Sequence, residues 1–205
     1  MKMFKDAIVL FLITVVAACA LGAVYEITKG PIEESKVKAK TEAYEKVFGE
    51  IPQLNEVDTG MIDAANTAIS EKENLTGSTV GEMLDVRDEN GQYLGTILSV
   101  TNANGYGGNI TIAMGVASDG TLKGIEFLEI SETAGLGMKA KDGSFLAQFK
   151  DVKTESFSLP KAKLSGETEM DAVSSATITS KAVNRAVNAG LLAAECIRAV
   201  YGVTD

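Results

Sequence analysis

Histidine and tryptophan are both absent from this chain of 205 residues. Without histidine, the chain cannot form a Ser-His-Asp triad, a Cys-His nucleophilic pair or a histidine-bearing zinc site. Cysteine is almost absent, since Cys19 lies in an apolar N-terminal run and Cys196 lies near the C-terminus. This spacing suits neither a metal site nor a disulfide between the two. Any chemistry must therefore come from carboxylates, hydroxyls or a bound cofactor.

Positive charge is also scarce, with 19 Lys and Arg residues against 28 Asp and Glu residues and a net charge of −9. Such a chain repels a phosphate backbone, so we do not expect nucleic acid as a partner. Hydrophobic residues nevertheless make up 45% of the sequence, which is enough for a packed core. The length allows one domain of ordinary size with an appendage.

Charge is missing altogether from the nineteen consecutive positions 7–25. A helix of about this length spans the core of a bilayer, so we predict a transmembrane helix at residues 7–27 after a short N-terminus at residues 1–6. The alternatives are a cleaved signal peptide and a lipoprotein signal at Cys19. The apolar run continues six residues beyond Cys19, which favours a retained anchor. Lysines on both sides of the run leave its orientation open from charge alone.

Apolar periodicity after the anchor predicts an α+β domain. Residues 28–78 predict an amphipathic helix that starts at Pro31, then an irregular connection with a short helix at residues 61–69. Alternating runs flank Asn90-Gly91 and Ser118-Asp119-Gly120, which indicates an antiparallel meander. The remaining expected elements are a short helix at residues 144–149, a strand at 157–164 and a last helix from about 180 to 201.

Three short stretches rich in glycine or hydroxyl groups interrupt this scaffold. "GYGG" at residues 105–108 precedes a strand, and "SETAGLG" at residues 131–137 follows one. Either stretch alone is typical of a turn or loop, although the amides of such loops can also bind a ligand. "DAVSSATITS" at residues 171–180 places five hydroxyls before the last helix, where we expect Thr179 or Ser180 to cap it.

In this order, the three stretches resemble the FMN-binding domain shared by the G subunit of the Rnf electron-transport complex and the C subunit of the sodium-translocating NADH:quinone reductase. The resemblance runs from the anchor to the last helix, and the length of the chain is typical of the Rnf branch. It implies an FMN-binding domain at residues 79–205, with an antiparallel sheet and flanking helices. The family signature Asp-x-x-Ser/Thr-Gly-Ala-Thr begins here at Asp171, and its threonine falls on Thr177. Covalent FMN on Thr177, through a phosphoester, is therefore implied.

The resemblance also implies the other site residues. Asp171, an acidic residue beside the expected phosphate, would be recognised by a flavin transferase or bonded to the turn, and would not act as a catalyst. Ser174, Ser175, Ala176 and Thr179 would lie around the phosphate. The expected contacts of the isoalloxazine ring are Glu132, Thr133, Gly135, Leu136, Tyr106 and Gly107, with Tyr106 as a stacking residue. Two positions depart from the family, because Ser175 replaces the signature glycine and Ala134 replaces a usual proline. If that glycine has a positive φ, Ser175 is strained by on the order of 1 kcal/mol.

The implied function is electron transfer by a subunit with covalent FMN, in a membrane complex that oxidises ferredoxin, reduces NAD and moves sodium ions or protons. The flavin supplies the chemistry, so neither a catalytic acid or base nor a metal is expected from the chain. The implied partners are other Rnf-type subunits, the transferase and the membrane, with the N-terminus cytoplasmic and the domain extracytoplasmic. The alternative is a membrane-anchored binding or structural module, pilin-like or lipoprotein-like. The start "MKMFKDAIVLF" lacks the peptidase site and the glutamate typical of pilins.

Overall fold

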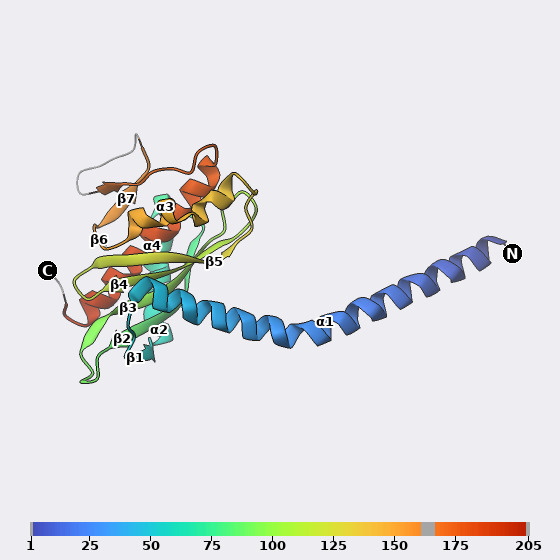
Figure 1. The fold of residues 1–205 in the computed structure, drawn as a ribbon, viewed down its shortest axis with the longest axis horizontal. Helices are drawn as coiled ribbons and strands as arrows, with labels where there is room; N and C mark the ends of the chain where they lie inside the picture. Colours follow the sequence, from blue (N-terminus) through green and yellow to red (C-terminus); the bar gives the residue numbers. More distant parts are fainter. Residues whose placement is uncertain (1, 161–166, 204–205) are drawn as a thin grey trace. The chain divides into compact units, whose positions relative to one another are not determined.

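The computed structural model describes residues 2–160 and 167–203 (Figure 1). The chain forms two compact units, Met1–Lys40 and Thr41–Asp205. A single helix, α1 (Lys2–Phe48), makes up the described part of the first unit and provides the first residues of the second. Each unit is described by itself below.

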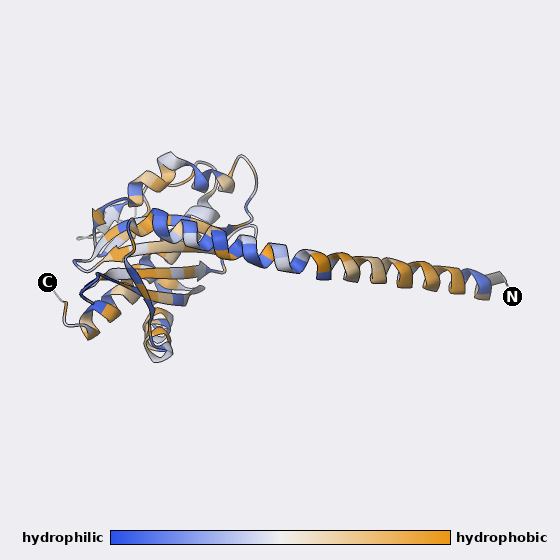
Figure 2. Cartoon of the chain, turned by 60° about the horizontal axis from the view of Figure 1, so that its bottom comes forward, coloured by the Kyte–Doolittle hydropathy of each residue, from blue (hydrophilic) through white to orange (hydrophobic). Residues whose placement is uncertain are grey.

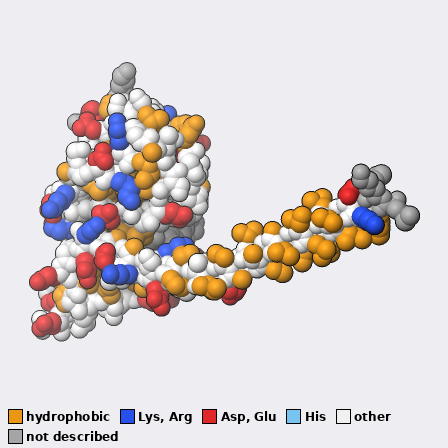
Figure 3. Space-filling model, turned by 45° about the vertical axis from the view of Figure 1, so that its right-hand side comes forward, with side chains coloured by type: hydrophobic (Ala, Val, Ile, Leu, Met, Phe, Trp, Pro, Cys, Tyr) orange, Lys and Arg blue, Asp and Glu red, His pale blue; other side chains and the backbone are white. Residues whose placement is uncertain are grey.

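The first unit has an apolar surface over most of its length, as Figures 2 and 3 show. Large apolar side chains are exposed from Phe4, at 74%, to Tyr25, at 59%. By length and composition this helix is able to cross a membrane. The predicted N-terminal apolar helix is therefore present.

Pro31 lies inside α1, so the prediction that a separate helix starts there is wrong. Proline removes one amide donor from a helix, but the preceding Gly30 keeps a negative φ and the helix continues. The first glycine with a positive φ is Gly49, at +94°, and α1 ends directly before it. Ile32 and Val37 remain exposed, so the apolar face of the helix is buried only in its last turns.

The second unit is built on a six-stranded antiparallel sheet in the order β1-β2-β3-β4-β5-β6. Strands that follow one another in sequence are therefore neighbours, which confirms the predicted meander. The strands are β1 (Gln53–Glu56), β2 (Ser78–Arg87), β3 (Tyr93–Asn102), β4 (Ile110–Ala117), β5 (Thr121–Ile130) and β6 (Val152–Lys153). The sequence did not indicate β1, because all four of its side chains are exposed and show no alternation.

Helices α2 (Thr59–Ser70) and α4 (Thr177–Val200) cover one face of the sheet. The opposite face is covered by the last turns of α1, where Tyr44 and Val47 pack against Ile97. The short elements are η1 (Glu73–Leu75), η2 (Gly137–Lys141), α3 (Gly143–Leu146), η3 (Ala147–Phe149), and the parallel strands β7 (Ser156–Ser158) and β8 (Glu167–Glu169). The α+β prediction is confirmed, and so are the helices predicted near residues 61–69 and 144–149. Of the strand predicted at 157–164, positions 161–164 lie outside the described residues.

Small side chains bring α4 close to the sheet. Ala182, Ala186 and Ala189 are fully buried on α4. A Cβ on Gly190 would lie 1.9 Å from Met114 Sδ, which shows that the helix backbone itself contacts the sheet. Packing this close fixes the position of both ends of α4 relative to the strands.

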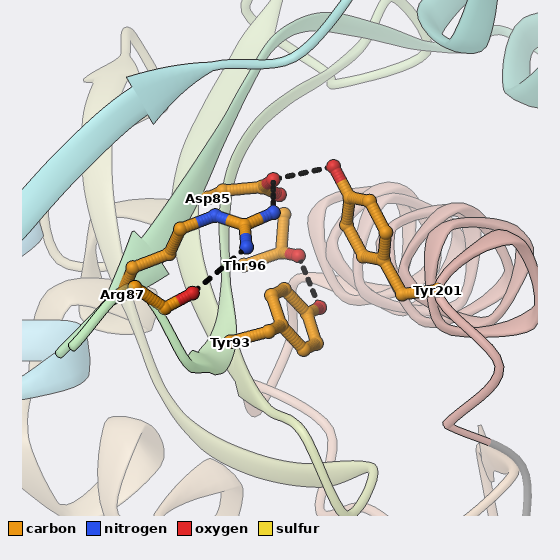
Figure 4. Close-up of polar contacts among 6 residues, drawn as sticks. Asp85, Arg87, Tyr93, Thr96 and Tyr201 are labelled. Carbon is orange, nitrogen blue, oxygen red and sulfur yellow. Dashed lines mark hydrogen bonds and ion pairs between the residues drawn. The ribbon is translucent and has the colours of Figure 1, made fainter.

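Polar contacts hold the C-terminal end of α4 (Figure 4). The Tyr201 hydroxyl donates to Oδ2 of the buried Asp85 at 2.5 Å, and Arg87 donates to the same oxygen at 3.2 Å. The Tyr93 ring lies 5.0 Å from the Tyr201 ring, and its hydroxyl is 2.6 Å from Thr96 Oγ1. These contacts join the end of the helix to β2 and β3.

The tyrosines of this unit predict a loss of stability at alkaline pH. Burial raises the pKa of Tyr93 to about 12, and burial together with the hydrogen bond to Asp85 raises the pKa of Tyr201. Unfolding lets each phenol ionise at its ordinary pKa of about 10, so the unfolded state gains stability relative to the folded state above that pH. We expect the free energy of unfolding to fall between pH 10 and about 12, measured by urea titration in detergent. Tyr93→Phe is expected to make this fall shallower, and an equally steep fall in that variant would contradict the assignment.

Candidate functional site

The three stretches singled out in the sequence meet at one pocket of about 480 Å³. The first lies between β3 and β4, the second follows β5, and the third leads into α4. The lining residues are Tyr106, Glu132, Thr133, Leu136, Gly137, Ser175, Ala176, Thr177, Ile178 and Thr179. A volume of this size is typical of a site for a small molecule or cofactor.

Glu132 joins the first two stretches. Its Oε1 accepts hydrogen bonds from the backbone amides of Tyr106, at 2.8 Å, and Gly107, at 3.3 Å. The residue is only 8% exposed, and these charge-assisted bonds offset the cost of burying its carboxylate. Glu132 therefore fixes the 105–108 loop against the end of β5.

Glycine is required where these loops approach one another. A Cβ on Gly107 would lie 2.0 Å from the Ser131 carbonyl oxygen, and one on Gly137 would lie 2.6 Å from Thr179 Oγ1. Real side chains do not approach so closely, so the loops can pack this closely only with bare backbone at both positions.

The hydroxyl-rich segment makes a sharp turn before α4. Ser175 has a φ of +60°, a left-handed conformation that costs a non-glycine residue roughly 1–2 kcal/mol. The Ala176 amide donates to the Val173 carbonyl at 3.0 Å and closes the turn. Gln148 Oε1 accepts from the Asp171 amide at 2.7 Å, which holds the start of the segment, and the Asp171 side chain is exposed.

The prediction that Thr179 or Ser180 caps the last helix is wrong. The helix begins at Thr177 with Ala176 as its N-cap, and Ala176 has no side-chain oxygen that could cap it. Ser180 Oγ instead donates to the Ala176 carbonyl and accepts from the Val173 amide, both at 2.9 Å. The turn at Ser175, and not the hydroxyl cluster, determines where the helix starts.

An uncapped helix end therefore lies at the pocket. Among the described residues, no side chain of the N-cap position satisfies the amides of the first turn. Such an end attracts anions because free N–H groups and the positive end of the helix dipole lie together. Thr177, the first residue of α4, is exposed and lines the pocket, whereas Thr179 is buried in the pocket wall.

The other expected residues lie in or beside the pocket. Gly107, Gly135 and Ser174 belong to the same loops without lining it, and Gly135 has a φ of +75°. Two lining residues were not predicted. Ile178 is 51% exposed. A large apolar side chain between two threonines is the feature of the sequence that could have indicated it. Gly137 ends the quoted loop and was not singled out.

The pocket has an apolar rim and few ionisable groups. Tyr106 is 70% exposed and Leu136 is 43% exposed, and both lie at the pocket together with Ile178. Glu132 is the one carboxylate among the lining residues. Within the described ranges, no cluster of three or more His, Cys, Asp or Glu residues could hold a metal ion. The arrangement suits a planar organic group with an anionic end.

Known proteins resemble this chain over most of its length. The family model of the FMN-binding domain matches residues 105–192. The G subunit of the Na⁺-translocating ferredoxin:NAD⁺ oxidoreductase complex of Acetobacterium woodii is 32% identical over 189 residues, which are 90% of this chain and 88% of that protein. The G subunit of the proton-translocating ferredoxin:NAD⁺ oxidoreductase complex of Clostridium ljungdahlii is 40% identical over 85 residues, or 42% of this chain and 45% of that protein. The structure of the C subunit of Na⁺-translocating NADH-quinone reductase from Parabacteroides distasonis is 24% identical, covers 76% of this chain and 79% of that chain, and has a TM-score of 0.47.

The positive φ of Ser175 predicts opposite effects for two neighbouring substitutions. Ser175→Gly relieves the left-handed strain, so we expect the free energy of unfolding to rise by up to about 1 kcal/mol. Ser174→Gly is the matched control, because Ser174 does not have a positive φ and glycine there only adds freedom to the unfolded chain, at a cost of about 0.4–1 kcal/mol. Urea unfolding of both variants measures the difference. Equal destabilisation by the two would show that Ser175 is not strained.

Proposed function

This chain belongs to the G-subunit family of ion-translocating oxidoreductase complexes, and from that membership we propose that it is an electron carrier with FMN bound covalently to Thr177. The carrier passes electrons between partner subunits of a membrane complex. That complex couples the oxidation of ferredoxin and the reduction of NAD⁺ to translocation of sodium ions or protons, the two ions that the names of the relatives give. Within such a complex the chain is one part of an oxidoreductase and translocase.

The single observation that supports the proposal best is the exposed Thr177 at the uncapped start of α4. A phosphate joined to its hydroxyl would lie next to first-turn amides that have no capping side chain. Each such interaction is worth roughly 0.3–1 kcal/mol when exposed, which is too little to hold a flavin. With a covalent bond, these weak interactions are sufficient, because a tethered cofactor stays at an effective concentration of about millimolar or more.

The residues of the pocket fit the rest of the cofactor. Bare backbone at Gly107 and Gly137 lets the loops pack closely against one another and against α4, which forms the wall of the pocket. Tyr106, Leu136 and Ile178 offer apolar surface at the rim, and Tyr106 is the stacking candidate. FMN, once bound, supplies the acceptance and release of electrons, while the protein binds, orients and shields it.

The pocket does not contain a base that could activate Thr177. Glu132 is the one carboxylate among the lining residues, and its Oε1 is engaged by two amides. Attachment therefore requires a separate flavin transferase. The exposed Asp171 side chain, six residues before Thr177 and held in place through its backbone by Gln148, is our candidate for recognition by that enzyme.

We place the globular unit on the extracytoplasmic side, with α1 as the retained anchor and the N-terminus in the cytoplasm. A covalent tether is of most use there, because a lost flavin is not replaced outside the cytoplasm. The alternative function, a membrane-anchored binding module, offers no reason for an exposed threonine at an uncapped helix end within the pocket.

Two threonine substitutions test the attachment. Thr177→Ala is expected to abolish covalent flavin and to leave the fold intact, because the side chain is exposed. Thr179→Ala is the control, since Thr179 is 1% exposed and truncating this buried side chain is expected to lower stability by about 1 kcal/mol while the flavin stays. Fluorescence of the boiled protein on a denaturing gel measures the covalent flavin. Persistent fluorescence in the Thr177→Ala protein would place the attachment elsewhere.

Protease accessibility tests the topology. Protease added outside sealed cells is expected to digest the globular unit and to leave a small N-terminal fragment that contains the apolar part of α1. A cytoplasmic marker protein of the same cells controls for leakage. Protection in intact cells, together with digestion in inverted vesicles, would reverse the proposed orientation.

A further inference from the structure

Only one of the two carboxylate oxygens of Glu132 accepts hydrogen bonds from the protein. Both amide hydrogen bonds reach Oε1, and Oε2 makes no hydrogen bond with any residue that the structure describes. No described lysine or arginine forms an ion pair with this carboxylate. An ionised carboxyl group has about four acceptor positions, so acceptor capacity remains on Oε2.

The free oxygen lies at the pocket. A Cβ on Gly137, which lines the pocket, would lie 2.8 Å from Glu132 Oε2. The same Cβ would lie 2.6 Å from Thr179 Oγ1, so Oε2 lies next to two residues of the pocket wall, Gly137 and Thr179, and itself belongs to a third. A ligand with an N–H or O–H group at this part of the wall would therefore lie close to an ionised acceptor.

We propose that Glu132 accepts a hydrogen bond from an N–H or O–H group of the bound flavin through Oε2, and that its negative charge makes the flavin harder to reduce. The inference rests on the proposed function, since it requires FMN in this pocket. FMN carries such donors on its ring, at N3, and on its ribityl chain.

The effect on reduction follows from the sign of the charges. Reduction adds electrons to the flavin, and a buried carboxylate without a cation partner raises the energy of added negative charge more than that of the neutral ring. Low exposure increases this effect, because water screens the carboxylate poorly at 8% exposure. The charge of Glu132 thus makes the flavin harder to reduce, while Oε1 of the same residue holds the 105–108 loop.

Neutral substitutions separate these two roles. Glu132→Gln keeps a carbonyl oxygen for the two loop amides and removes the charge. Glu132→Ala is a second neutral variant, to be used if the Gln protein does not fold or load flavin. Glu129→Gln is the matched control, because Glu129 lies near the end of β5, three residues before Glu132, is exposed and does not line the pocket.

The measurement is a redox titration of the full-length flavinylated protein in detergent, followed by flavin absorbance. At a fixed electrode potential, we expect the neutral variants to increase the ratio of reduced to oxidised flavin at least tenfold, which is about 30 mV for a two-electron step. Glu129→Gln is expected to change that ratio less than twofold. An unchanged ratio in the neutral variants of Glu132, or an equal change in the Glu129 control, would overturn the inference.

Two further readouts complete the test. Fluorescence on a denaturing gel reports the covalent flavin independently. If the unsubstituted protein does not fluoresce, the proposed function itself is refuted. If it fluoresces but the ratio is unchanged in the variants, only this role of Glu132 is refuted. A shift of the N3–H-sensitive vibrational bands of the flavin in Glu132→Ala identifies the ring as the donor. A changed ratio without such a shift excludes the ring N3–H as the donor.

Discussion

Helix α4 lies so close to the sheet that its backbone at Gly190 contacts Met114, and the rest of the site depends on this packing. Buried alanines along the same face keep the helix backbone close to the strands over several turns. At the C-terminal end, Tyr201 and Asp85 join it to β2. The N-terminal end is consequently fixed at the pocket, with Thr177 as its first residue.

The loops around that helix end contain two features that would each destabilise the fold without a partner. Ser175 has a left-handed backbone, and Glu132 is a carboxylate almost removed from water. Each is offset by a specific partner: the Ala176 amide closes the turn onto Val173, and two loop amides bind the carboxylate. Strained and buried polar groups of this kind are concentrated at functional sites, where they fix the positions of backbone groups. Here they place an uncapped helix end, bare glycine backbone and a charged oxygen around one volume.

Much of this could be predicted from the sequence, because the signals are local. The apolar run, the alternating strands around Asn90-Gly91 and the order of the three loop stretches depend on neighbouring residues only. The failures occurred where the backbone conformation of a nearby residue, or a contact with a distant loop, decides the outcome. Pro31 usually starts a helix, but no turn-forming backbone stops α1 before Gly49. The hydroxyls of Thr179 and Ser180 are typical of a cap, yet the turn at Ser175 starts the helix earlier and buries both. The hydrogen bonds to one oxygen of Glu132 form only because two loops about 25 residues apart come together, which no local pattern shows.

The central claim is that the phosphoester is on Thr177 and on no other hydroxyl of the segment. The most direct measurement is fragmentation mass spectrometry of the tryptic peptide of residues 164–181, which contains all five hydroxyls of the hydroxyl-rich segment. The account predicts that this peptide carries the mass of FMN less one water, with the added mass on the fragments that contain Thr177. An unmodified peptide, or the added mass on Thr179 or Ser174, would contradict it.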